Sequence, residues 1–107
     1  MKILLALVAA SLLAQDRPAP HLTTVTPDTG KATAEFSTAG EHLGKDAVKE
    51  LYLTNGKDDV KLRIIAQKED VIQFQVPTHT KAGRYSLMLL SADGKQFLEQ
   101  PVKLTVE

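Results

Sequence analysis

The fold is decided by the stretch 70–77, which reads DVIQFQVP. Its apolar residues Ile72, Phe74 and Val76 occupy every second position, and glutamines fill the positions between them. Because successive side chains of a β-strand point to opposite faces, this alternation predicts a strand with one buried and one solvated face. Pro77 cannot donate a backbone hydrogen bond to a sheet, so the strand is expected to end there.

Six further segments have the composition of strands. Together with the first they cover residues 22–26, 32–37, 48–54, 60–64, 72–76, 85–90 and 102–106. Most of them alternate with a period of two, but Leu87 to Leu90 are four consecutive apolar residues. That run predicts a central strand, or one whose outer face is also partly covered. A bulge is expected near Lys49-Glu50, where the alternation slips by one residue.

Turn-forming residues separate these segments at intervals of about ten residues, as expected for short strands. The turns are predicted at Pro27-Asp28-Thr29-Gly30, Ala39-Gly40, Asn55-Gly56, Pro77, Ala82-Gly83 and Ala92-Asp93-Gly94. No stretch after residue 20 has helical periodicity over ten or more residues. The predicted fold class is therefore all-β: an immunoglobulin-like β-sandwich of about seven antiparallel strands.

The N-terminus has the pattern of an export signal. Lys2 precedes an apolar run from Ile3 to Ala10, and Ala14 is a small residue at the expected cleavage position. We expect residues 1–14 to be a signal peptide, 15–20 a proline-containing linker, and 21–107 the folded domain. The run is too short for a spanning helix, so no stable membrane span is expected after cleavage. An uncleaved interfacial anchor and a buried N-terminal helix are the alternatives.

Composition narrows the function classes. The chain of 107 residues has 13 basic and 13 acidic side chains, which argues against a nucleic-acid partner because such binding requires a basic face. It has no cysteine, which excludes disulfides, thiolate metal sites and lipidation of a cysteine. With export, this composition predicts a secreted or periplasmic protein.

Four motifs in order resemble the IPT/TIG domains, an early-set branch of immunoglobulin-like folds. They are Thr26-Pro27-Asp28-Thr29-Gly30, Gly40-Glu41-His42-Leu43-Gly44, Asp70 to Pro77 and Gly83-Arg84-Tyr85-Ser86-Leu87. The resemblance covers about 85 residues. It departs at Lys31-Ala32, where the family often has a glycine pair, so this corner is expected to be built differently.

This resemblance implies structural roles for Pro27, Gly30, Gly40, Gly44, Pro77, Gly83 and Tyr85 at strand corners. Tyr85 is similar to the tyrosine of an immunoglobulin-like corner, whose ring packs inward and whose hydroxyl holds nearby backbone. The resemblance also implies a binding or spacer module, and no enzyme.

The remaining chemistry-bearing residues form no recognisable catalytic pattern. His21, His42 and His79 have no short metal-ligand spacing, and Asp58-Asp59 lacks the oxygen pattern of a calcium loop. No serine lies in a nucleophile elbow. We therefore predict no catalytic residue, no metal and no cofactor.

Tyr52 is the one candidate ligand contact, because it points opposite to the apolar Leu51 and Leu53. The leading hypothesis is an exported, non-catalytic binding or adaptor module that recognises a protein or a cell-envelope component. The alternative is a small carbohydrate-binding module, and the third hypothesis is a structural envelope protein without a ligand.

Overall fold

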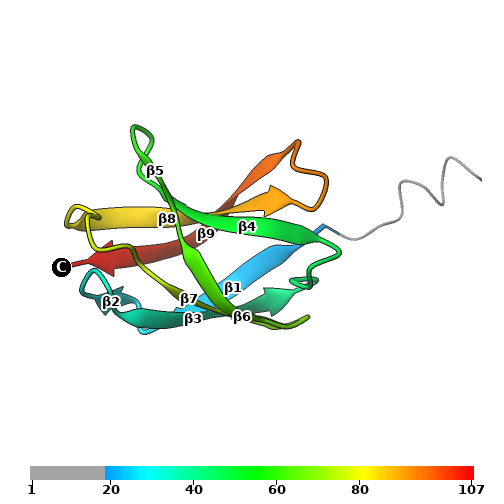
Figure 1. The fold of residues 1–107 in the computed structure, drawn as a ribbon, viewed down its shortest axis with the longest axis horizontal. Coiled ribbons are helices and arrows are strands. Elements are labelled where there is room, and N and C mark those ends of the chain that lie inside the picture. Colours follow the sequence, from blue (N-terminus) through cyan, green and yellow to red (C-terminus); the bar gives the residue numbers. More distant parts are fainter. Residues whose placement is uncertain (1–18) are drawn as a thin grey trace, which may run out of the picture.

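The computed structural model describes residues 19–107, and its strands form two sheets packed face to face (Figure 1). The strands are β1 (His21–Thr26), β2 (Thr29–Gly30), β3 (Glu35–Glu41), β4 (Val48–Thr54), β5 (Asp59–Lys61), β6 (Arg63–Gln67), β7 (Val71–Gln75), β8 (Gly83–Ser91) and β9 (Phe97–Val106). The predicted signal peptide and most of the predicted linker lie outside the described residues. Within 19–107, no helix has the length and apolar character to cross a membrane.

Sheet I has the order β1-β3-β7-β6, and sheet II has the order β2-β9-β8-β4-β5. This partition of the strands is that of an immunoglobulin-like sandwich, which confirms the predicted fold class. All neighbouring pairs are antiparallel except β2 and β9, which pair in parallel. The expectation of antiparallel strands throughout is therefore wrong for that pair.

The parallel pair arises because the first strand changes sheets. A cis Thr26-Pro27 bond follows β1 in sheet I, and the chain then joins sheet II as β2. The backbone N–H of Thr105 donates to the carbonyl of Asp28, and that of Glu107 donates to the carbonyl of Gly30. No pattern in the sequence indicates β2, because a strand of two residues is too short to show an alternation.

The predicted strand 60–64 is likewise two strands. Its first part is β5 in sheet II and its second part starts β6 in sheet I. Leu62, 3% exposed, lies at the crossing, and its N–H donates to the carbonyl of Leu51. The alternation predicts correctly that Leu62 is buried. It does not distinguish a strand that stays in one sheet from a segment that passes from one sheet to the other at Leu62.

The predicted strand 32–37 starts later than expected and extends further. Lys31 and Ala34 close a turn through an Ala34 N–H to Lys31 carbonyl bond, with Thr33 at a φ of 74°. β3 then begins at Glu35. The corner at Lys31-Ala32 is thus a tight turn without glycine.

The core lies between the sheets and is centred on two phenylalanines. Phe36 of β3 and Phe74 of β7 are register partners whose rings stack with centroids 5.6 Å apart. The other fully buried side chains come from both sheets and from the loop between β3 and β4: Leu22, Leu43, Leu51, Leu53, Ile72, Leu87, Leu89 and Leu104. Burial of this apolar surface is the main stabilising contribution to the fold.

β8 is the central strand of sheet II, as the consecutive apolar run predicts. Leu87 and Leu89 face the core at 0% exposure. Met88 and Leu90 point to the outer face, yet they are only 8% and 6% exposed. The outer face of β8 is therefore covered, and the register shift between Val48 and Glu50 confirms the expected bulge in the neighbouring β4.

We predict that Leu62→Ala lowers the free energy of unfolding by about 2–4 kcal/mol, because it opens a cavity where the chain passes between the sheets. The measurement is urea denaturation of the full chain. Ile65→Ala is the matched control. Because Ile65 is 47% exposed, this substitution should lower the free energy of unfolding by less than about 1 kcal/mol. Equal losses would contradict a core role for Leu62.

Candidate functional site

Tyr52 lies on the outer face of sheet II, on the side opposite to the buried Leu51 and Leu53, and is half-buried. Its register partners are Lys61 on β5 and Met88 on β8. Directly paired residues share a face of the sheet, so these three side chains form a row across the outer surface.

Phe97 on β9 meets Tyr52 above the central strand. Neighbouring strands are about 4.8 Å apart, so residues on β4 and β9 are separated by roughly twice that distance across β8. The two ring centroids are nevertheless only 5.5 Å apart, in an edge-to-face arrangement with an interplanar angle of 70°. Both side chains therefore lean over β8 and cover Met88 and Leu90.

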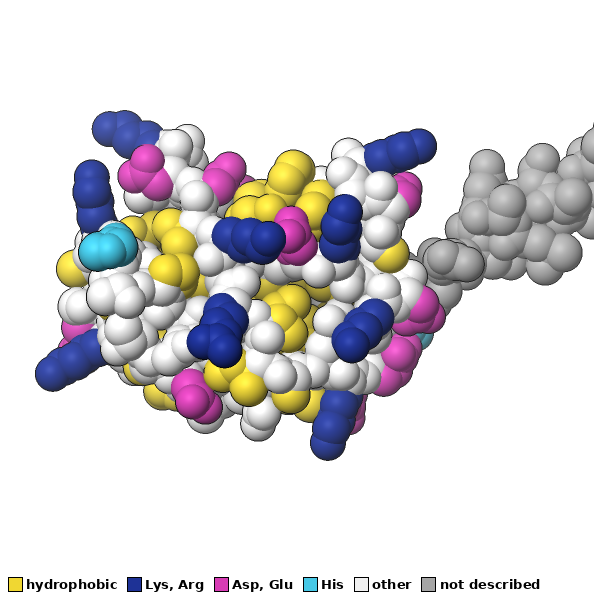
Figure 2. Space-filling view, in the orientation of Figure 1, with side chains coloured by type: hydrophobic (Ala, Val, Ile, Leu, Met, Phe, Trp, Pro, Cys, Tyr) yellow, Lys and Arg dark blue, Asp and Glu magenta, His cyan; other side chains and the backbone are white. Residues whose placement is uncertain are grey.

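These four side chains, Tyr52, Phe97, Met88 and Leu90, are here called the aromatic patch. Phe97 is its most accessible member, with 57% of the side chain exposed. Figure 2 shows hydrophobic atoms gathered at the upper surface of the molecule, bordered by basic and acidic side chains. The register places Glu50, Lys61 and Glu99 on this border.

A chain of polar contacts fixes the Tyr52 ring. Its hydroxyl donates to Glu50 Oε1 over 2.7 Å, and Lys61 Nζ contacts Glu50 Oε2 at 2.5 Å. The hydrogen bonds from Lys61 and Tyr52 lower the pKa of Glu50, and the same bond to Glu50 raises the pKa of Tyr52. The carboxylate thus stays ionised at neutral pH, and the ring is held in one orientation.

This arrangement suits a ligand that is apolar on one face and polar around its edge. The faces of aromatic rings attract the slightly positive C–H groups of such a ligand. Glu50 and Glu99 supply hydrogen-bond acceptors at the border, and Lys61 supplies donors. A pyranose ring has this distribution of C–H and hydroxyl groups.

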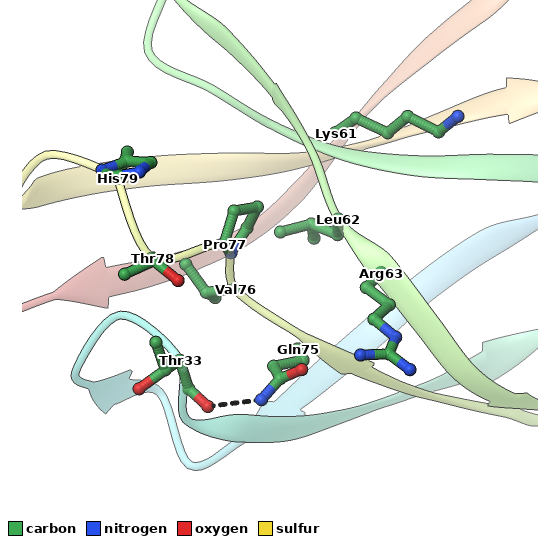
Figure 3. Close-up of a pocket in the computed structure, with 9 residues that line it drawn as sticks. All are labelled: Thr33, Lys61, Leu62, Arg63, Gln75, Val76, Pro77, Thr78 and His79. Atoms are coloured by element: carbon green, nitrogen blue, oxygen red, sulfur yellow. Dashed lines mark hydrogen bonds between the residues drawn. The ribbon is translucent and has the colours of Figure 1, made fainter.

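A second concave surface, here called the side groove, lies at the open side of the sandwich (Figure 3). It has a volume of about 560 Å³ and is bounded by residues 61–63 and 75–79 together with Thr33. Leu62 points toward Pro77 in Figure 3, with Arg63 and His79 at opposite ends. The Gln75 side-chain amide donates to the carbonyl of Thr33 over 2.8 Å.

Three of the predicted corner residues act through close packing. A Cβ atom at Gly40 would collide with the carbonyl oxygen of His21, and one at Gly30 would lie 2.6 Å from the ring of Phe36. The Tyr85 ring is 4% exposed, and its hydroxyl donates to the carbonyl of Lys81 over 2.7 Å.

The other four also lie outside the strand centres. Pro27 follows the cis bond, and Gly44 accepts the N–H groups of Ala47 and Val48 in the β3–β4 loop. Gly83 has a φ of 154°, and Pro77 lines the side groove. None of the seven corner residues belongs to the aromatic patch.

The histidines lie apart at different corners. His21 is 3.9 Å from Glu41, His42 is 3.7 Å from Glu69, and His79 lies in the side groove. Asn55 Oδ1 accepts the N–H groups of Lys57 and Asp58, which makes the Asn55–Asp58 segment a closed turn. Among residues 19–107, no three His, Asp or Glu side chains are grouped as metal ligands.

Solved structures with the same fold include bacterial binding proteins. One is SGBP-B of the Bacteroides ovatus mixed-linkage glucan utilization locus, in complex with a mixed-linkage heptasaccharide; the TM-score is 0.59 at 17% identity over 85% of this chain and 24% of that one. An auxiliary nutrient binding protein from Bacteroides thetaiotaomicron has a TM-score of 0.59 at 19% identity, over 85% of this chain and 21% of that one.

A further auxiliary nutrient binding protein, from Bacteroides ovatus, has a TM-score of 0.50 at 16% identity, over 85% of this chain and 20% of that one. The chain thus spans between a fifth and a quarter of the length of these proteins. At such identities the likeness concerns the fold. No family model and no curated protein matches the chain.

Sequence reasoning selected Tyr52 but missed Phe97. Phe97 follows a turn in which Ser91 Oγ donates to Asp93 and accepts the N–H of Gln96. This turn sets the pairing of Phe97 with Leu90 on β8. The only signal in the sequence was the consecutive apolar run of β8, which requires a cover on its outer face but does not say which residue supplies it.

We predict that Glu50→Gln lowers the melting temperature at neutral pH, by an amount corresponding to about 0.2–1 kcal/mol for an accessible ion pair. Because the pKa of folded Glu50 lies below its usual value of 4.5, its contribution is present above that pH and is lost as the pH falls through the lowered pKa. The difference between wild type and variant should therefore shrink on acidification. Thermal unfolding between neutral and acidic pH measures it.

Glu35→Gln is the control for this series. Glu35 is exposed on β3, so the substitution removes the same negative charge from sheet I. It should leave the pH dependence of the melting temperature unchanged. A constant difference between Glu50→Gln and wild type at every pH would contradict the role assigned to the ion pair.

Proposed function

We propose that this chain is an exported, non-catalytic module that binds a glycan on the aromatic patch. The observation that carries the proposal is the meeting of Tyr52 and Phe97 above β8, with Glu50, Lys61 and Glu99 around them. This favours the alternative hypothesis, a carbohydrate-binding module, over the leading hypothesis of a module that recognises a protein or a cell-envelope component.

The size of the patch supports a small ligand. Stable protein interfaces bury about 800 Å² on each partner around an apolar centre. Phe97 and Ile65 are the large hydrophobic residues that the described part of the chain exposes, and they lie on different sheets. One accessible ring and one half-buried ring with a charged border fit one or two sugar units better than a protein surface.

The fold likeness gives independent support. The neighbour from the mixed-linkage glucan locus is described in complex with a heptasaccharide, and the others are described as nutrient binding proteins. A related function in this chain would be binding without chemistry.

The proposal includes export of the chain and its membership of the IPT/TIG domains that it resembles. The pattern at residues 1–14 supports a binding surface outside the cytoplasm, where polysaccharides are encountered. We predict that the protein recovered from its native cell begins at Gln15. N-terminal sequencing tests this, and recovery of a chain that begins at Met1 or Lys2 would contradict signal cleavage.

We predict that Phe97→Ala and Tyr52→Ala each weaken glycan binding by about tenfold or more, as expected for an aromatic anchor at the centre of a binding surface. Affinity electrophoresis through gels containing soluble neutral and acidic polysaccharides identifies the retained glycan. Isothermal titration with its oligosaccharide then gives the affinities.

Ile65→Ala serves as the control, because it removes the exposed apolar side chain of sheet I. It should leave glycan affinity unchanged. If the wild type is retained by no polysaccharide while it pulls down one specific envelope protein, the protein-partner reading replaces the proposal.

A further inference from the structure

We propose that the side groove is a second subsite that takes the carboxylate of an acidic sugar unit, so that the glycan preferred by this chain is an acidic oligosaccharide. This inference rests on the proposed glycan binding and extends it to a surface separate from the aromatic patch.

The floor of the groove is apolar. Leu62 and Val76 are 3% and 1% exposed, and Figure 3 shows Pro77 beside them. The volume of about 560 Å³ falls within the range of about 300–1,000 Å³ that is typical of small-ligand sites. Such a floor accepts the C–H face of a sugar ring while leaving its substituents at the edge.

The charged residues that line the groove, Lys61 and Arg63, are basic, and no acidic residue lines it. Because Lys61 extends away from the groove in Figure 3, Arg63 supplies the positive charge at the groove. In the part of the chain that the structure describes, the Arg63 guanidinium has no ion pair or hydrogen bond, whereas Lys61 is paired with Glu50. An unpaired guanidinium offers two parallel N–H donors, which match the two oxygens of a carboxylate.

The polar neighbours of Arg63 complete the subsite. Gln75 is its register partner on β7, and the Gln75 amide nitrogen is held by the Thr33 carbonyl. The side-chain oxygen of Gln75 thus remains to accept a hydrogen bond from a sugar hydroxyl. Thr33 and Thr78 add hydroxyl groups at the border.

The groove and the aromatic patch are linked along the chain by the short segment Lys61-Leu62. Lys61 contacts Glu50 at the patch, and the next residue, Leu62, forms the floor of the groove. Figure 3 shows the Lys61 side chain extending away from the groove while Leu62 points into it. A ligand chain lying on the patch would therefore cross β5 at Lys61 and enter the groove beside Arg63. A chain of sugar rings has apolar faces for both surfaces, which favours an acidic saccharide over an acidic peptide.

The test uses isothermal titration of the full chain with hexagalacturonate and with its methyl ester, a matched neutral chain. We expect the wild type to bind the acid at least about tenfold more tightly than the ester. Arg63→Gln should remove this preference by lowering the affinity for the acid far more than the affinity for the ester. Lys45→Gln, which removes one exposed positive charge in the β3–β4 loop, should keep the preference.

Other outcomes separate the two proposals. Equal binding of acid and ester, or binding of neutral glucans alone, overturns the acidic subsite and leaves glycan binding intact. Binding of no saccharide at all overturns both. Hexaglutamate that binds as tightly as hexagalacturonate in an Arg63-dependent way would identify the groove as a peptide site and overturn the inference. Circular dichroism of Arg63→Gln, expected to match wild type, ensures that a lost preference reflects the groove.

Discussion

The structure depends on one constraint: β8 is apolar on both faces. Its inner side chains Leu87 and Leu89 build the core, so Met88 and Leu90 on the outer side need a second cover. Tyr52 and Phe97 supply it by leaning over the strand from either side. The residues that shield the sheet are therefore the ones that reach solvent as an aromatic surface, so the proposed binding and the stability of the sheet depend on the same side chains.

Much of the sandwich could be predicted from local alternation. The pattern of 70–77 gave β7, and the apolar run of 85–90 gave the central strand with its covered outer face. The features that local alternation did not predict depend on contacts between residues distant in sequence. Leu62 points to the core whether its strand stays in one sheet or crosses to the other. The two-residue alternation of 60–64 therefore carries no information about the crossing. Phe97 acquires a role only through its register with Leu90.

The candidate site was half predictable for the same reason. Tyr52 was selected because its own neighbours, Leu51 and Leu53, must face inward. The polar contacts that orient it, from Glu50 and Lys61, join a bulged strand to an edge strand. A local sequence pattern can indicate a bulge, but it does not show that the Glu50 carboxylate and the Lys61 ammonium group lie side by side. Electrostatic arrangement is therefore the part of this protein that only the three-dimensional structure supplies.

The crossing at Leu62 also affects how copies of the molecule meet. Open sheet edges present unpaired backbone groups that can recruit strands from other chains, and short or interrupted edge strands limit this. By passing from one sheet to the other, the segment divides one potential long edge into β5, of 3 residues, and β6, of 5 residues. Lys61 and Arg63 flank the break. The same crossing that positions the side groove therefore protects this side of the sandwich against edge-to-edge aggregation.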